Sequence, residues 1–297
     1  MTTVDVLDSA MSYVEAGRPG AGPALVFLHG NPTSSHLWRR VLPEIGLRAR
    51  MLAPDLIGMG ESGKPRLAYT FDDHARYLAG WFDALDLRDV VLVGHDWGGA
   101  LAFDWASRHP ERVSGLAFME TIVKPMAGAE FPDAARPFFA SMRTPGVGEE
   151  LILDRNQQME QMLARPTGNV TDEDRETYRR PYPTRESRRP LLQWPRSMPI
   201  DGEPADVVAR IESYDAWLAT SPDVPKLLLA FDAAGPGILV GPRLVDWCAG
   251  HVAGLEIEQC GYSSHVAPED QPAAIAEAIT AWAGRHRLGA RAVRNPA

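Results

Sequence analysis

The sequence VVLVGHDWGGALAFDWASRH, residues 90–109, decides the fold. The four apolar residues 90–93 predict a buried strand, and residues 99–109 predict a helix. Three glycines lie in the short turn between them and allow the two segments to approach closely. The stretch therefore predicts a strand–turn–helix unit that raises the side chain of Asp96 above the edge of a sheet.

Similar apolar runs recur along the chain and alternate with segments that have helical spacing, such as residues 72–85 and 273–286. Strands that are apolar along their whole length and separated by helices are typical of a parallel sheet with helices on both faces. The further strands are predicted at residues 24–30, at the start of 49–62, and at 113–120, 224–231 and 254–260.

The pattern changes after Glu120. The following stretch contains many prolines and helical segments rich in charge, such as residues 148–163, and it has no convincing buried strand. We therefore predict a core made of residues 1–123 and 216–297, with a helical cap domain at residues 124–215 inserted between its halves.

The overall composition is that of a globular protein, with 297 residues, 45% hydrophobic and a net charge of −9. The negative charge argues against a nucleic-acid partner, since phosphate binding needs a basic face. No stretch approaches the ~18 apolar residues of a membrane span, and the start MTTVDVLDSA does not resemble a secretion signal. The two cysteines, Cys248 and Cys260, suit a reducing compartment, and we expect a cytoplasmic protein. We also expect a monomer or weak oligomer without a membrane partner.

Asp96 stands where a turn of this kind usually presents a serine nucleophile. A carboxylate is ionised at neutral pH and needs no base in order to attack. Serine attacking a saturated carbon would leave an ether, whereas aspartate leaves an ester that water can cleave. Asp96 therefore predicts displacement of a leaving group from a saturated carbon, followed by ester hydrolysis. A helix-capping aspartate is the alternative interpretation.

A second loop, FLHGNPTSS at residues 27–35, follows the first clear predicted strand. Hydrolases with a nucleophile turn place their oxyanion loop at this position. Asn31 would bring a backbone amide and a carboxamide to the sheet edge that carries Asp96. We expect the backbone amides of Asn31 and Trp97 to hold the oxyanion of the ester-cleavage step.

His265 lies in a loop between the last predicted strand and the final helix, where the chain order nucleophile, acid, histidine would place a general base. His95, beside the nucleophile, is expected to point away from the site. Two carboxylates could orient the imidazole of His265: Glu120 ends the strand after the turn helix, and Asp232 ends the next core strand. The pattern alone does not choose between them.

The leaving group decides the reaction. A halide needs only weak donors in a dry pocket, and the indole N–H of Trp97 and the side-chain amide of Asn31 are such donors. An epoxide oxygen needs a proton, which Tyr178, Tyr182 or Tyr214 in the cap could supply. Epoxide hydrolysis therefore remains an alternative at this point.

Long stretches of the chain, from about residue 22 to residue 284, resemble the haloalkane dehalogenases of the α/β-hydrolase superfamily. This resemblance implies a mostly parallel eight-stranded sheet flanked by helices, with an inserted helical cap. It rests on HGNPTSSHLWR (29–39), PDLIGMGESGKP (54–65), GHDWGGALAFDWA (94–106) and the cap segment 178–207.

The resemblance also implies the roles of five residues. Asp96 would be the nucleophile, His265 the base and Glu120, rather than Asp232, the acid, while Asn31 and Trp97 would bind the halide. The reaction would convert a small halogenated hydrocarbon and water into an alcohol, a halide and a proton through an alkyl-aspartate ester. No metal and no organic cofactor are implied. Luciferase-like oxygenases share the scaffold and form a further alternative.

The resemblance places seven side chains in the substrate pocket or its entrance, and two features depart from the family pattern. Gln158 stands where relatives often have a bulky apolar residue, and Gly261-Tyr262-Ser263-Ser264-His265 replaces a Gly-x-Gly-x-His approach to the histidine. A polar residue at 158 is expected to widen or wet the pocket. The predicted pocket residues are Phe139, Gln158, Trp194, Met198, Ile238, Leu239 and Val266.

Overall fold

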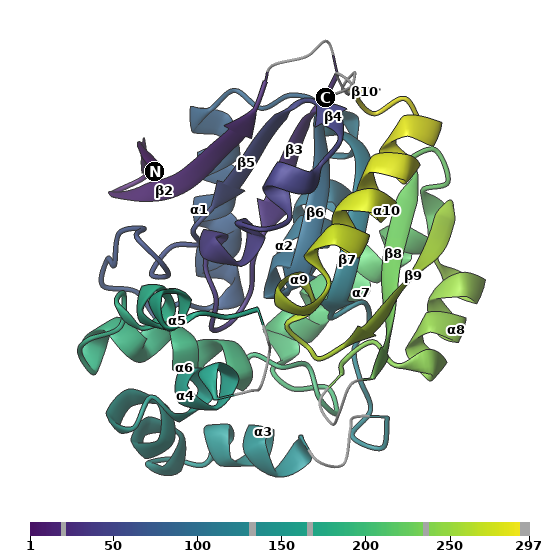
Figure 1. The fold of residues 1–297 in the computed structure, drawn as a ribbon. Helices are drawn as coiled ribbons and strands as arrows, with labels where there is room; N and C mark the ends of the chain where they lie inside the picture. The colour runs from purple at the N-terminus through teal and green to yellow at the C-terminus, as the bar shows by residue number, and fades with distance from the viewer. Residues whose placement is uncertain (19–21, 131–134, 165–168, 234–237, 292–297) are drawn as a thin grey trace.

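The computed structural model describes residues 1–18, 22–130, 135–164, 169–233 and 238–291. In these residues, one mixed sheet of eight strands forms the centre of the molecule, which confirms the predicted fold (Figure 1). Five of its neighbouring pairs are parallel, from β5 through to β9. In spatial order the strands are β1 (Thr2–Val6), β2 (Ser9–Gly17), β5 (Arg50–Pro54), β3 (Ala24–Leu28), β6 (Val90–Asp96), β7 (Val113–Thr121), β8 (Lys226–Ala233) and β9 (Leu255–Ser263).

The antiparallel edge of the sheet is not anticipated by the sequence pattern. β1 and β2 form a hairpin whose second strand pairs antiparallel with β5. The outward half of these strands is exposed, so neither has the continuous apolar run of the central strands. A second, two-stranded sheet pairs β4 (Leu47–Arg48) with β10 (Ala290–Arg291).

Alternate side chains of the central strands face two separate hydrophobic clusters. In β6, Val90 and Leu92 pack into one cluster, and Val91 and Val93 pack into the other. The first cluster is covered by α1 (Phe71–Ala84), α2 (Trp97–Arg108), α7 (Ala205–Thr220) and α8 (Pro242–His251), and the second by α10 (Pro272–Arg285). Burial on both faces explains the unbroken apolar sequence of these strands.

The cap helices gather at one end of the sheet (Figure 1). They are α3 (Arg136–Arg143), a π-helical turn (Glu149–Asp154), α4 (Gln157–Leu163), α5 (Asp172–Arg179) and α6 (Arg189–Arg196). Helix α7 then runs without a break through residue 215 and contacts the core, where Tyr214 donates a hydrogen bond to the carbonyl of Ile122. The domain boundary at residue 215 therefore falls inside a helix, and the division of the chain stays a prediction. Among the described helices, none has both the length and the apolar character needed to cross a membrane.

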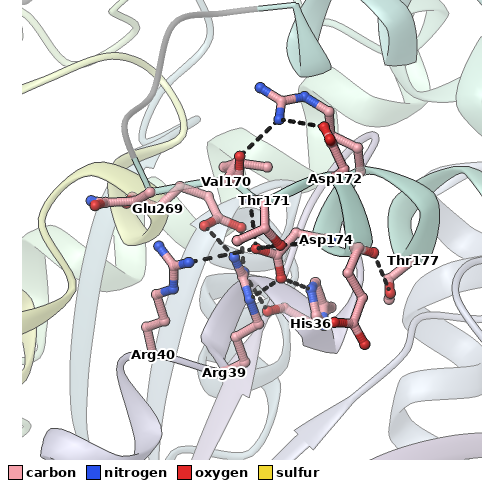
Figure 2. Close-up of polar contacts among 12 residues, drawn as sticks. His36, Arg39, Arg40, Val170, Thr171, Asp172, Asp174, Thr177 and Glu269 are labelled. Atoms are coloured by element: carbon pink, nitrogen blue, oxygen red, sulfur yellow. Dashed lines mark hydrogen bonds and ion pairs between the residues drawn. The ribbon is translucent and has the colours of Figure 1, made fainter.

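A cluster of charged side chains links the cap helices to the core (Figure 2). Arg39 extends from the core toward two carboxylates, forming a bidentate pair with Glu269 of α9 (Ala267–Asp270) and a 2.7 Å ion pair with Asp174 of α5. His36 also reaches Asp174, at 2.8 Å, and Tyr178 donates its hydroxyl proton to Glu269. The two carboxylates are almost fully buried, so their charges depend on these partners.

Candidate active site

Asp96 occupies a strained turn between β6 and α2. Its backbone has φ 51° and ψ −130°, a conformation that a residue with a side chain rarely adopts. Glycine at two neighbouring positions makes the turn possible: a Cβ atom on Gly98 would lie 2.2 Å from the carbonyl oxygen of Leu28, and one on Gly30 would lie 2.3 Å from Oδ2 of Asp96. The turn places the Asp96 carboxylate at the N-terminus of α2, which favours negative charge.

The carboxylate of Asp96 is buried and has two polar partners. The backbone amide of Asn31 donates to Oδ2 at 2.8 Å, and Nε2 of His265 lies 3.7 Å from Oδ1. Burial would raise the pKa of Asp96, but the nearby His265 outweighs burial and lowers it. Asp96 is therefore an ionised carboxylate, as a nucleophile requires.

His265 stands between two carboxylates. Its Nε2 faces Asp96, and its Nδ1 lies 3.1 Å from Oε2 of Glu120. Burial would lower the pKa of His265, but Asp96 and Glu120 together raise it to about 10. The imidazole is consequently protonated at neutral pH while Asp96 is ionised.

Glu120 is the carboxylate that the structure brings to His265. It lies one residue before the end of β7 with φ 45°, is buried, and accepts backbone hydrogen bonds from Leu239 at 2.7 Å and Val240 at 3.0 Å. Asp232, the other candidate on pattern alone, has an exposed side chain near the end of β8. The orienting carboxylate is thus held by the loop that follows β8.

His95 contacts the loop of His265, a contact that the sequence does not predict. The pairing of β6 with β7 shifts its register between His95 and Asp96, and the His265 loop lies against the His95 side chain. Nε2 of His95 lies 2.7 Å from the carbonyl oxygen of His265, and the two rings are 5.1 Å apart. Its place directly before the nucleophile is the only sequence signal for this contact, which joins residues 170 positions apart.

Asn31 and Trp97 present side-chain N–H groups near Asp96. The side-chain amide of Asn31 donates to Oε1 of Gln158 at 2.9 Å and to the carbonyl of Leu191 at 3.3 Å. The indole N–H of Trp97 has no hydrogen-bond partner among the described residues, and its ring stacks on Trp194 with 4.8 Å between centroids. The cap therefore supplies contacts to both members of the predicted halide-binding pair.

The predicted pocket residues lie in different surroundings. Gln158, Trp194 and Leu239 contact Asn31, Trp97 and Glu120 respectively. Phe139 and Met198 pack in the same hydrophobic cluster as Trp97, whereas Ile238 and Val266 pack in the cluster on the other face of the sheet. The part that all seven side chains play in the pocket stays a prediction.

The loop before His265 is anchored by its serines. Ser263 and Ser264 both donate to Oδ2 of Asp270, through hydroxyl groups at 3.1 and 2.6 Å and through the Ser264 amide at 2.8 Å. Tyr262 projects outward and is 68% exposed. The unusual Tyr-Ser-Ser sequence therefore replaces a flexible glycine with an attachment to α9.

Two of the three cap tyrosines use their hydroxyl groups elsewhere. Tyr178 donates to Glu269, and Tyr214 donates to the backbone of Ile122. Tyr182 is buried with Lys64 above its ring, 5.0 Å from the ring centre. In the described part of the chain, no three or more His, Cys, Asp or Glu residues are grouped so that they could hold a metal ion.

The chain is similar to known proteins along most of its length. A family model of the alpha/beta hydrolase fold matches residues 23–223. A haloalkane dehalogenase of Mesorhizobium japonicum is 47% identical over 282 residues, covering 94% of this chain and 89% of the relative. One of Sphingobium indicum is 43% identical, covering 96% and 95%.

Solved structures of haloalkane dehalogenases are equally similar. The crystal structure of DbeA from Bradyrhizobium elkani has a TM-score of 0.89 at 43% identity, covering 96% of this chain and 98% of that one. The structure of DatA from Agrobacterium tumefaciens has a TM-score of 0.88 at 39% identity, covering 96% of each. With likeness of this extent in both sequence and structure, the chain belongs to the haloalkane dehalogenase family of the α/β hydrolases.

Proposed function

We propose that this haloalkane dehalogenase uses Asp96, His265 and Glu120 as its catalytic residues, with Asn31 and Trp97 as its halide-binding pair. The observation that carries the proposal is the position of His265, with Nε2 3.7 Å from Asp96 and Nδ1 3.1 Å from Glu120. The overall reaction is hydrolysis of a carbon–halogen bond, which yields an alcohol, a halide and a proton.

In the first step, Asp96 attacks the carbon that bears the halogen. A carboxylate oxygen forms a bond to this carbon, and the halogen leaves with the electron pair of the broken bond. The free indole N–H of Trp97 supports the role of halide donor, because it has no other described partner. The product of this step is an alkyl ester of Asp96 and a bound halide ion.

In the second step, His265 accepts a proton from water as the water oxygen attacks the carbonyl carbon of the ester. The backbone amide of Asn31, already 2.8 Å from Oδ2, supports an oxyanion-binding role, and we assign the same role to the amide of Trp97. Collapse of the tetrahedral intermediate breaks the acyl–oxygen bond, and the alcohol leaves with a proton. One Asp96 oxygen then comes from water.

Formation of the ester in the first step also makes His265 able to act as a base in the second step. A pKa of about 10 keeps His265 protonated in the free enzyme, and a protonated imidazole cannot accept a proton. Alkylation converts Asp96 into a neutral ester and removes one of the two charges that raise this pKa. His265 therefore becomes a competent base only after the ester has formed.

A single-turnover reaction in H₂¹⁸O tests the proposal. With a bromoalkane, we expect ¹⁸O in the peptide that contains Asp96 and unlabelled oxygen in the first alcohol molecules. His265→Ala should accumulate protein whose mass is raised by the alkyl group. Label in the first alcohol, or a variant whose mass stays unchanged while bromide is released, would contradict the covalent mechanism.

The family membership and the two free cysteines support proposals for the substrate class and the cellular compartment. We propose a small halogenated hydrocarbon as substrate, and an enzyme that acts in the cytoplasm as a monomer or weak oligomer. Both cysteines, Cys248 and Cys260, are buried free thiols, which supports a reducing compartment. Tyr178 and Tyr214 donate their hydroxyl protons elsewhere, so epoxide hydrolysis would depend on the buried Tyr182.

A further inference from the structure

Gln158 accepts a hydrogen bond from the side-chain amide of Asn31, which is one of the two donors proposed to bind the halide. It is the second residue of cap helix α4. The helix begins directly after Asn156, whose left-handed conformation (φ 52°) redirects the chain from the preceding π-helical turn. From there Oε1 of Gln158 accepts a hydrogen bond from Nδ2 of Asn31 at 2.9 Å. This contact joins residues 127 positions apart and links the cap to the oxyanion loop.

The orientation of both amide groups is fixed by a backbone atom. The carbonyl of Leu191 can only accept, and it lies 3.3 Å from Nδ2 of Asn31, so the nitrogen of the Asn31 side chain must face α6 and α4. Gln158 must then present its oxygen to this nitrogen. Both protons of the Asn31 amide are engaged, and none is left for a halide in the free enzyme.

The nitrogen of Gln158 is the complementary unused donor. Among the described residues, Nε2 of Gln158 has no hydrogen-bond partner, and the side chain is half-buried beside Asn31. A halide that approaches Asn31 first meets the carbonyl oxygen of Gln158, which repels an anion. If the terminal amide of Gln158 turns over, the same position presents an N–H group instead.

Building on the function proposed above, we propose that Gln158 is a specificity-determining member of the halide site. When a halide forms, the Gln158 amide rotates, releases Asn31 and donates Nε2–H to the ion alongside Asn31 and Trp97. The exchange is favourable because a hydrogen bond to an ion is stronger than the neutral amide–amide bond that it replaces.

This role predicts a preference among halides. Chloride is smaller than iodide and concentrates its charge, so it depends more on N–H donors. A third donor should therefore favour binding of chloride, and the turnover of chloroalkanes, more than the iodo compounds. An apolar side chain at position 158 would leave two donors and shift the preference toward the larger halides.

Halide titration of the full-length enzyme, followed by tryptophan fluorescence, tests the proposal without turnover. Gln158→Leu and Gln158→Met should weaken chloride binding about tenfold, with a smaller effect on iodide. Gln161→Leu is the matched control, because Gln161 is exposed on the same helix. Thermal unfolding of each variant verifies folding, and Gln158→Met keeps the length of the side chain if the leucine variant is unstable.

The direction in which chloride affinity changes in the Gln158 variants distinguishes the possible roles of Gln158. If Gln158 only blocks Asn31, its removal will tighten chloride binding, and tighter or unchanged binding overturns the proposal. Initial rates with matched chloro- and bromoalkanes should show a larger loss of kcat/KM for the chloro compound. If wild-type protein neither binds halide nor releases it from any haloalkane, the proposed function itself fails. If wild-type protein does both and the Gln158 variants match it, only this inference fails.

Discussion

Nε2 of His95 donates a hydrogen bond to the backbone carbonyl of His265, so the residue before Asp96 holds the loop that carries the proposed base. Burial lowers the pKa of His95 to about 4, which keeps its ring neutral. A neutral ring has a single N–H, and the carbonyl of His265 requires it on Nε2. Strand β6 therefore carries the proposed nucleophile, Asp96, and in the adjacent residue the side chain that positions the proposed base.

We expect His95→Phe to slow ester hydrolysis on the order of 100-fold, because a shift of about 1 Å in His265 is sufficient for such a loss. Formation of the ester should change much less, since Asp96 attacks without a base. Rapid-quench measurement of halide and alcohol in one turnover separates the two steps. His109→Phe, at the C-terminal end of α2, is the control. Equal slowing of both steps would show that His95 supports the whole site rather than His265.

Asp96→Asn should lower the pKa of His265 below its wild-type value of about 10, because one of two charged partners is lost. The substitution mimics the charge of the alkylated enzyme. NMR titration of the His265 imidazole measures the pKa directly, with His265→Gln used to assign the signal. An unchanged pKa would contradict the proposed activation of the base by ester formation.

The same pKa predicts how stability depends on pH. The pKa of His265 is about 10 in the folded protein against an ordinary value of 6.5, so the folded state binds the proton more tightly. Its contribution to the free energy of unfolding is fully present below pH 6.5 and is lost as the pH rises toward 10. We expect the free energy of unfolding, measured with urea between pH 6.5 and 10, to fall more steeply with pH for wild type than for Asp96→Asn. Parallel curves would argue against the ion pair.

Gly30→Ala should reduce activity on the order of 100-fold while the protein still folds. The added methyl group would lie 2.3 Å from Oδ2 of Asp96, so the nucleophile must move. Gly241→Ala is a matched control, because nothing lies within 4 Å of its added methyl group. Halide release and thermal unfolding measured together distinguish displacement of Asp96 from general destabilisation. Full activity in Gly30→Ala would contradict the close packing of the turn.

Glu269→Gln should destabilise the protein by about 3 kcal/mol, since it removes the charge of an almost fully buried carboxylate and leaves the partly buried Arg39 with one charged partner fewer. The exposed pair between Arg50 and Glu15 provides the comparison, and Arg50→Gln should cost about 0.5 kcal/mol. Urea denaturation measures both. Similar losses for the two variants would mean that the charged cluster in Figure 2 contributes no more than a surface ion pair.

The sequence predicts those structural elements that are determined by a short, continuous stretch of residues. The six strands, from 24–30 to 254–260, and the Asp96 turn have apolar runs and glycines that reveal them directly. The β1–β2 hairpin escapes this reasoning because its strands are half-exposed. The contact between Gln158 and Asn31 escapes it because the two residues meet only after the cap has packed on the core.

The distance to His265 in the folded protein also distinguishes two carboxylates that the sequence pattern leaves equivalent. Glu120 and Asp232 both lie one residue before the end of a core strand, and no local feature of the sequence distinguishes them. The distinction arises from the fold, since the left-handed backbone at Glu120 and the amides of Leu239 and Val240 direct that carboxylate toward His265. Only the three-dimensional arrangement shows which acid accompanies the base.

The two amides that hold Glu120 belong to the loop after β8, and Leu239 is also a predicted pocket residue. Substrate preference and base strength therefore share one short piece of backbone. Directed evolution that reshapes the pocket through residues 238–240 will alter turnover together with selectivity. Changes in cap helices α4 and α6, which contact Asn31 through Gln158 and Leu191, offer a second route to new substrates, separate from the backbone that holds Glu120.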